Sequence, residues 1–97
     1  MLLERRTVSH KTPKDGRLEI TEGAAERLRV RVPDGFRLVV NGAEGRGCLA
    51  AMVCTCRGAE SPHQHWFLES AALTSLAAGG EVAVELREDG VVAVEDR

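Results

Sequence analysis

The chain has 97 residues, of which 43% are hydrophobic and 29% charged, a composition typical of one small globular domain and not of a disordered segment. Its net charge is only −2, but residues 1–57 contain eleven Lys and Arg against seven Asp and Glu, whereas residues 58–97 contain two against eight. Halves of opposite sign favour either a surface that binds a polyanion or pairing between the halves, within one chain or between two copies. Solvated faces of unlike charge that bind nothing would give the same distribution.

The sequence contains no apolar stretch of membrane-spanning length, and its first residues, MLLERRTV, lack the apolar run of a secretory signal peptide. We therefore expect a cytoplasmic protein without a membrane partner, in a compartment where thiols stay reduced. Three cysteines, an odd number, then favour metal binding or redox use over a disulfide framework. Only three residues are aromatic, so the core must consist mainly of small aliphatic side chains, and a metal or a partner subunit would add stability.

Three segments share the same local pattern: KDGRLEI, PDGFRLVV and EDGVVAVE each join an Asp-Gly turn signal to a short alternating or β-branched run. This pattern predicts a mainly β single domain over residues 1–97. We expect a small barrel or sandwich of about six or seven short antiparallel strands with one short α-helix.

The segment RLRVRVPDGFRLVV alternates apolar residues with arginines, which predicts a strand that begins at Arg27, although residues 21–28 also have features of a helical turn. A three-residue loop at 33–35 would make one face of the resulting hairpin apolar and place Arg31 opposite Arg37 on the other. Like charges directly opposite each other destabilise a sheet unless another group neutralises them. Either a nucleic-acid phosphate or an acidic protein surface would do so. The candidate residues for this binding face are Arg27, Arg29, Arg31 and Arg37.

The next segment, NGAEGRG at residues 41–47, predicts a flexible turn, because it lacks the Lys-Ser/Thr pair of a phosphate-binding loop. Cys48, a few residues later, is expected to be a core residue.

The stretch MVCTCRGAESPHQHWFLES, residues 52–70, contains four of the six Cys and His residues of the chain, as C-x-C followed by H-x-H. Alternate residues of a strand share a face, so a hairpin with residues 57–62 as its loop would place Cys56 opposite His63 and Cys54 opposite His65. Two thiolates and two imidazoles are the ligands of a tetrahedral zinc site, with copper(I) as the alternative metal. We therefore predict a metal site on a hairpin at residues 48–69, although buried cysteines beside surface histidines would give the same sequence pattern. Its ligands would be Cys54, Cys56, His63 and His65.

The remaining elements complete the expected domain. Ser70 is a suitable N-cap for a short helix over residues 71–78, and two glycines follow it. The last hairpin, with its loop at residues 88–90, pairs Leu86 with Val92.

A site with four protein ligands leaves no position for water or substrate, which favours a structural role over catalysis. The expected function is therefore a small zinc-binding β module that engages another macromolecule, either a protein partner or a second copy in a homodimer. Three alternatives stay open: a DNA-binding protein that uses the arginine face, a metal-handling or sensing protein, and a small metalloenzyme.

Overall fold

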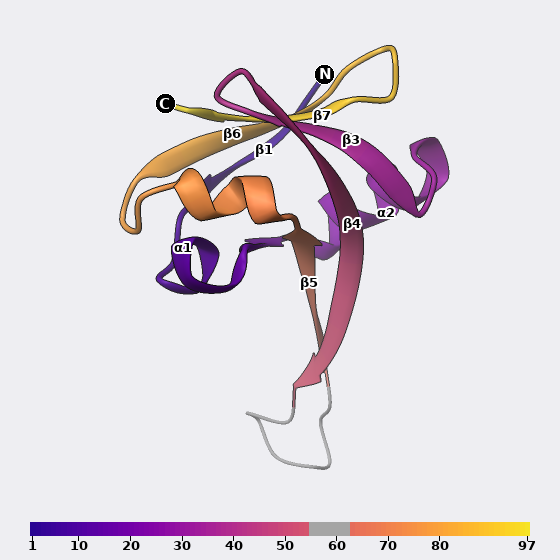
Figure 1. The fold of residues 1–97 in the computed structure, drawn as a ribbon. Coiled ribbons are helices and arrows are strands. Elements are labelled where there is room, and N and C mark those ends of the chain that lie inside the picture. Colours follow the sequence, from indigo (N-terminus) through magenta and orange to yellow (C-terminus); the bar gives the residue numbers. More distant parts are fainter. Residues whose placement is uncertain (55–62) are drawn as a thin grey trace.

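The computed structural model describes residues 1–54 and 63–97, without the side chains of Cys54 and His63. The described chain forms one seven-stranded sheet that curls into a nearly closed barrel, in the strand order β1-β6-β7-β3-β4-β5-β2 (Figure 1). None of the helices in the described part of the chain is long and apolar enough to span a membrane. The strands are β1 (Leu2–Thr7), β2 (Arg17–Ile20), β3 (Gly35–Val40), β4 (Ala43–Cys54), β5 (His63–Glu69), β6 (Glu81–Leu86) and β7 (Val92–Asp96), and the helices are α1 (Lys11–Asp15), α2 (Glu22–Arg31) and the 3-10 helix η1 (Ala71–Ser75).

The predicted class, a small mainly β barrel, is confirmed. The strand pairs are antiparallel with one exception: β3 and β7 run parallel, with Leu38 opposite Val92. This parallel pair joins segments that are far apart in the sequence, so no local turn signal could have indicated it.

The helix α2 replaces the strand that the arginine alternation predicted from Arg27. Thr21 is its N-cap, and the Thr21 Oγ1 atom accepts a hydrogen bond from the Ala24 amide at 3.3 Å. Ala24 and Leu28, four residues apart, are buried against the barrel, whereas Val30 is 85% exposed. The burial spacing is therefore that of a helix, and the alternation of Val and Arg has no structural counterpart.

Because α2 occupies this segment, the hairpin expected around residues 33–35 does not form. The true hairpin joins β3 to β4 through Asn41 and Gly42, whose φ angles of 48° and 87° are those of a type I′ turn. It pairs Val40 with Ala43.

The predictions for the last hairpin and for the helix after Ser70 agree more closely with the structure. The last hairpin has the expected register, with Leu86 opposite Val92 and Val84 opposite Val94. Ser70 caps a helix as expected, accepting a hydrogen bond from the Ala72 amide at 3.2 Å, but this helix is a 3-10 helix that ends at Ser75.

The interior of the barrel is filled by side chains of β2, β3, β5, β6, β7 and α2, which are aliphatic except for Phe36. Val8, which follows β1, and Leu73 and Leu76, in and just after η1, complete this core. Partly buried residues, Trp66 among them, pack against this core. The largest fully buried apolar side chains are Leu18, Leu28, Leu38, Leu68, Leu73, Val40, Val82, Val84, Val92 and Val94.

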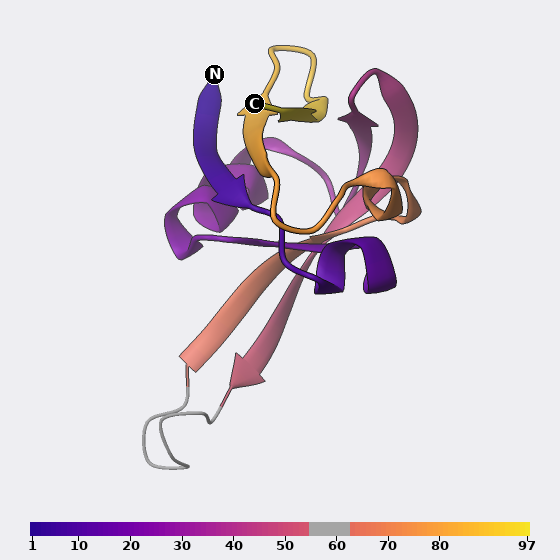
Figure 2. The same cartoon turned by 90° about the vertical axis from the view of Figure 1, so that its left-hand side faces the viewer.

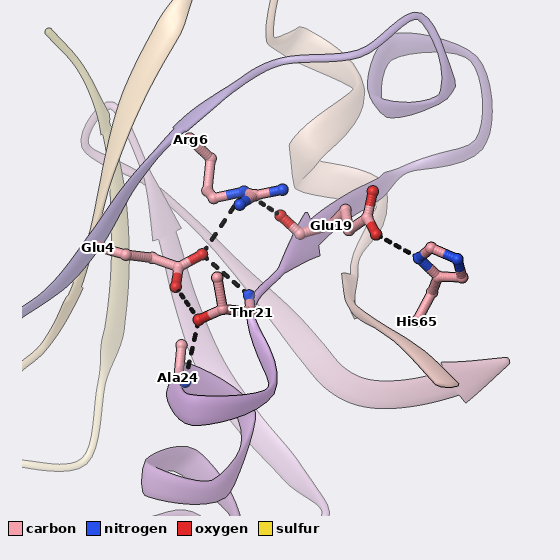
Figure 3. A network of polar contacts seen from close by, with 6 residues as sticks. All are labelled: Glu4, Arg6, Glu19, Thr21, Ala24 and His65. Atoms are coloured by element: carbon pink, nitrogen blue, oxygen red, sulfur yellow. Dashed lines mark hydrogen bonds and ion pairs between the residues drawn. The ribbon is translucent and has the colours of Figure 1, made fainter. Parts of the chain in front are cut away.

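Side chains close the seam between β1 and β2, the two end strands of the sheet (Figure 3). The Arg6 guanidinium donates from Nε to the backbone carbonyl of Glu19 at 3.0 Å. The Glu4 carboxylate accepts from the Thr21 amide at 3.1 Å and from the Thr21 hydroxyl. Glu4 thus joins β1 to the cap of α2, and Arg6 joins β1 to the free edge of β2.

The hairpin of β4 and β5 extends well beyond the other strands (Figures 1 and 2). On one side β3 begins at Gly35, opposite Cys48, so the rest of β4 is paired only with β5. On the other side β2 ends at Ile20, opposite Trp66. The unflanked part of the hairpin, which we call the β4–β5 arm, consists of residues 49–54 and 63–65.

Candidate functional site

The register of the β4–β5 arm differs by two residues from the prediction. Cys54 lies opposite His63, and Met52 lies opposite His65, where Cys54 was expected. A shift of two residues leaves every side chain on the same face, so the hydrophobic pattern could not distinguish the two registers. Cys56 lies outside the described residues.

His65 is held by a carboxylate from the neighbouring strand β2 (Figure 3). Its Nδ1 atom is 2.6 Å from Oε2 of Glu19, and both side chains are partly exposed. An ionised carboxylate only accepts hydrogen bonds, so Nδ1 carries the proton in this contact. The contact with Glu19 therefore places a proton on Nδ1 and helps to orient the His65 ring.

A second set of polar contacts crosses the same face of the sheet. Arg17 donates from Nε to Glu69 at 2.8 Å, and its terminal nitrogen lies 3.5 Å from the sulfur of Met52. Phe67 lies between Arg17 and Met52 in the strand register and is only 6% exposed.

The structure thus brings three of the four predicted metal ligands onto adjacent positions of one ladder. Cys54 and His63 form one pair of opposite residues, and His65 belongs to the next same-face pair. Among the described side chains alone, no three Cys, His, Asp or Glu residues are grouped closely enough to hold a metal ion. The sequence missed Glu19, although KDGRLEI places it on the same face as Arg17, because the pairing of β2 with β5 is a long-range contact.

The predicted arginine face of a strand hairpin is wrong. Arg27, Arg29 and Arg31 lie on α2, and all three are exposed. Arg37 lies on β3, where it forms an ion pair with Glu44. The expected repulsion between Arg31 and Arg37 does not arise, because the four arginines are divided between a helix and a strand.

The expectation that Cys48 is a core residue is also wrong, since its side chain is exposed. Cys48 instead lies at the edge of a groove of about 470 Å³ that the sequence did not indicate. Inside the groove, the Arg29 guanidinium lies 5.0 Å from the centre of the Trp66 ring. The residues that line the groove are Arg29, Val32, Pro33, Asp34, Cys48, Leu49 and Trp66.

The sequence matches no protein-family model, and no curated protein or solved structure shows significant similarity to it.

Proposed function

We propose that the chain is a small metal-binding β module whose zinc ion is bound at the end of the β4–β5 arm. The ligands are Cys54, Cys56, His63 and His65. The observation that carries the proposal is the 2.6 Å contact between His65 Nδ1 and Glu19, beside the pair formed by Cys54 and His63. Histidines that bind metal ions through one ring nitrogen almost always donate the other N–H to a carboxylate, a carbonyl or water.

The spacing of the ladder supports this assignment. Opposite residues of an antiparallel pair have Cβ atoms about 4.5–5.5 Å apart, and alternate residues of one strand share a face. In the strand register Cys54, His63 and His65 therefore occupy neighbouring positions of one face, and we propose that a sulfur and two ring nitrogens from these positions bind one ion. In this arrangement His65 coordinates through Nε2, and Cys56 supplies the fourth ligand.

The position of the arm suggests what the metal does. Among the described side chains of the arm, only Leu49 packs against the hydrophobic core, at its margin. We therefore expect the barrel to stay folded without metal, while zinc fixes the two strands of the arm to each other. This separation from the core favours an exchangeable site, as in a metal-handling or sensing protein, over a metal on which the whole fold depends.

Met52 gives a specific reason to test copper(I) as well. Met52 lies opposite His65 in the strand register, and thioether and thiolate sulfurs are ligands that copper(I) prefers.

Native mass spectrometry of the reduced protein, titrated with zinc and separately with copper(I), tests the proposal. We expect one zinc ion per chain in the wild type and loss of that ion in Cys54→Ser and in His65→Ala. The matched control is Cys48→Ser, which removes an exposed thiol of the same strand and should keep its zinc. The proposal is contradicted if the wild-type protein stays metal-free with excess zinc, or if Cys48→Ser loses zinc as the other two variants do. If the protein retains copper(I) more tightly than zinc, the site is assigned to copper(I).

A further inference from the structure

We propose that Asn41 is a site of covalent modification, at which spontaneous deamidation releases the β3–β4 turn from the end of β7. Asn41 is the single asparagine of the chain, and a glycine follows it. It lies in the turn before β4, whereas the β4–β5 arm lies at the other end of that strand (Figure 1). The inference therefore does not depend on the metal site.

The reaction at this bond needs water and hydroxide and no other reactant. Hydroxide removes the proton of the Gly42 amide, and the nitrogen attacks the Cγ atom of Asn41. The new N–C bond closes a cyclic succinimide, while the bond from Cγ to Nδ2 breaks and Nδ2 leaves as ammonia with a proton from water. Water then opens the ring at either carbonyl, which leaves aspartate or isoaspartate at position 41.

The turn leaves the reacting groups of both residues accessible, since Asn41 and Gly42 are exposed. Gly42 has no side chain to shield its nitrogen, and a Cβ atom built on it would have no atom within 4 Å. In the described part of the chain the Gly42 amide donates to no acceptor. No hydrogen bond between described residues therefore has to break before this amide loses its proton.

The carboxamide of Asn41 is held by Asp96, the last residue of β7. Its Nδ2 atom donates to Oδ2 of Asp96 at 3.1 Å, and its Oδ1 atom accepts from the Asp96 amide at 2.9 Å. Ring closure bonds Cγ to the Gly42 nitrogen, so the carboxamide has to turn toward Gly42 and away from Asp96. We therefore expect the reaction to proceed from a locally opened turn and the two contacts to slow it.

The product cannot reproduce these contacts. A carboxylate at position 41 has no N–H to donate to Asp96, and it places a second negative charge beside the first. Isoaspartate also routes the main chain through the former side chain, which adds a backbone atom to a two-residue turn.

The same turn supports the parallel pair of β3 and β7. The Asn41 amide donates to the Val94 carbonyl at 3.0 Å, directly after the position where Val40 lies opposite Val94. A change in the backbone at position 41 therefore reaches this pair. Deamidation should loosen the end of β7 on the barrel.

Intact-mass spectrometry of the reduced, metal-free protein follows the reaction during incubation at mildly alkaline pH. The change from amide to carboxylate raises the mass, whereas isomerisation at the Asp-Gly bonds of the chain leaves it unchanged. Peptide mapping then separates Asn41 from Gln64, the one other side-chain amide. We expect the folded protein to accumulate the product, faster as the pH rises and more slowly than the same chain unfolded in urea.

Two variants test the restraint by β7. Asp96→Ala should deamidate about two- to tenfold faster than the wild type, because the opened turn is then more populated. Glu95→Ala is the matched control, since it removes the neighbouring carboxylate, which pairs with Arg87 and not with the turn. It should react at the wild-type rate.

A third variant, Asn41→Asp, imitates one of the two products directly. Like purified deamidated protein, it should have a lower urea midpoint than the wild type and altered amide resonances at residues 94–96. The proposal is overturned if folded protein gains no mass while the unfolded chain does, or if Asp96→Ala reacts no faster than Glu95→Ala. It is also overturned if deamidated protein keeps the wild-type midpoint and resonances.

Discussion

The substitution Glu19→Gln tests whether the contact between Glu19 and His65 serves metal binding. The substituted side chain keeps its size but cannot fix the His65 tautomer as a carboxylate does, because an amide both donates and accepts. The backbone contacts of residue 19 are unaffected: its carbonyl still accepts from Arg6, and its position opposite Phe67 is unchanged. The variant should therefore fold normally.

Glu19→Gln should change the zinc affinity and the folding stability by different amounts. Both side chains are partly exposed, 35% for His65 and 41% for Glu19, so the pair contributes at most about 1 kcal/mol to folding. Removing the hydrogen-bond partner of a metal-bound histidine typically weakens metal affinity about 10- to 100-fold, or about 1.4–2.8 kcal/mol. Zinc affinity should thus fall much more than the free energy of unfolding of the metal-free protein.

A competition titration against a chromophoric zinc chelator, with the thiols reduced, measures the affinity, and urea denaturation measures the stability. Glu69→Gln is the matched control, because Glu69 lies on the same face, is similarly exposed and pairs with Arg17 instead of a histidine. Its zinc affinity should stay within about threefold of the wild type. The reasoning is refuted if Glu19→Gln binds zinc as tightly as the wild type, or if both variants lose affinity equally.

Three further predictions concern the barrel that supports the arm. Gly16→Ala should lower the free energy of unfolding by about 1–3 kcal/mol, because the φ angle of Gly16 is +70° and the new Cβ would lie 2.6 Å from the Ser70 carbonyl oxygen. Gly23→Ala is its control: this position lies in α2, a Cβ there would have no atom within 4 Å, and the free energy of unfolding should rise by up to about 1 kcal/mol. Thr21→Val removes the N-cap of α2 and should cost about 1 kcal/mol in urea denaturation; an unchanged midpoint would contradict the role of this cap. Leu28→Ala, at a fully buried position, should cost about 2–5 kcal/mol, and a loss below about 1 kcal/mol would show that α2 packs only loosely on the barrel.

The sequence indicates the fold class because alternation and turn residues are local signals. The register of the last hairpin followed from Asp89-Gly90 and the surrounding valines. The flexible turn expected over residues 41–47 is confirmed only at Asn41-Gly42, which form the turn between β3 and β4, because residues 43–47 belong to β4. The error at residues 27–32 has a different cause: alternation favours a strand, but the cap at Thr21 and burial against the barrel favour a helix, and tertiary packing prevails.

The candidate site was accessible from the sequence only in part. The C-x-C and H-x-H pairs suggested ligands on one face of a hairpin, and the structure places Cys54 opposite His63. The contact of His65 with Glu19 joins residues 46 positions apart and depends on β2 lying beside β5, which no local pattern encodes. The groove beside Arg29 was hidden for a similar reason, since it exists only where α2 packs next to the end of the β3–β4 pairing.

X-ray absorption spectroscopy at the zinc edge tests the central claim most directly, because it reports the ligand atoms of the bound ion. For the reduced, zinc-loaded protein we predict two sulfur ligands at about 2.3 Å and two imidazole nitrogens at about 2.0–2.1 Å. A first shell made of oxygen and nitrogen without sulfur would contradict the metal site at the end of the β4–β5 arm.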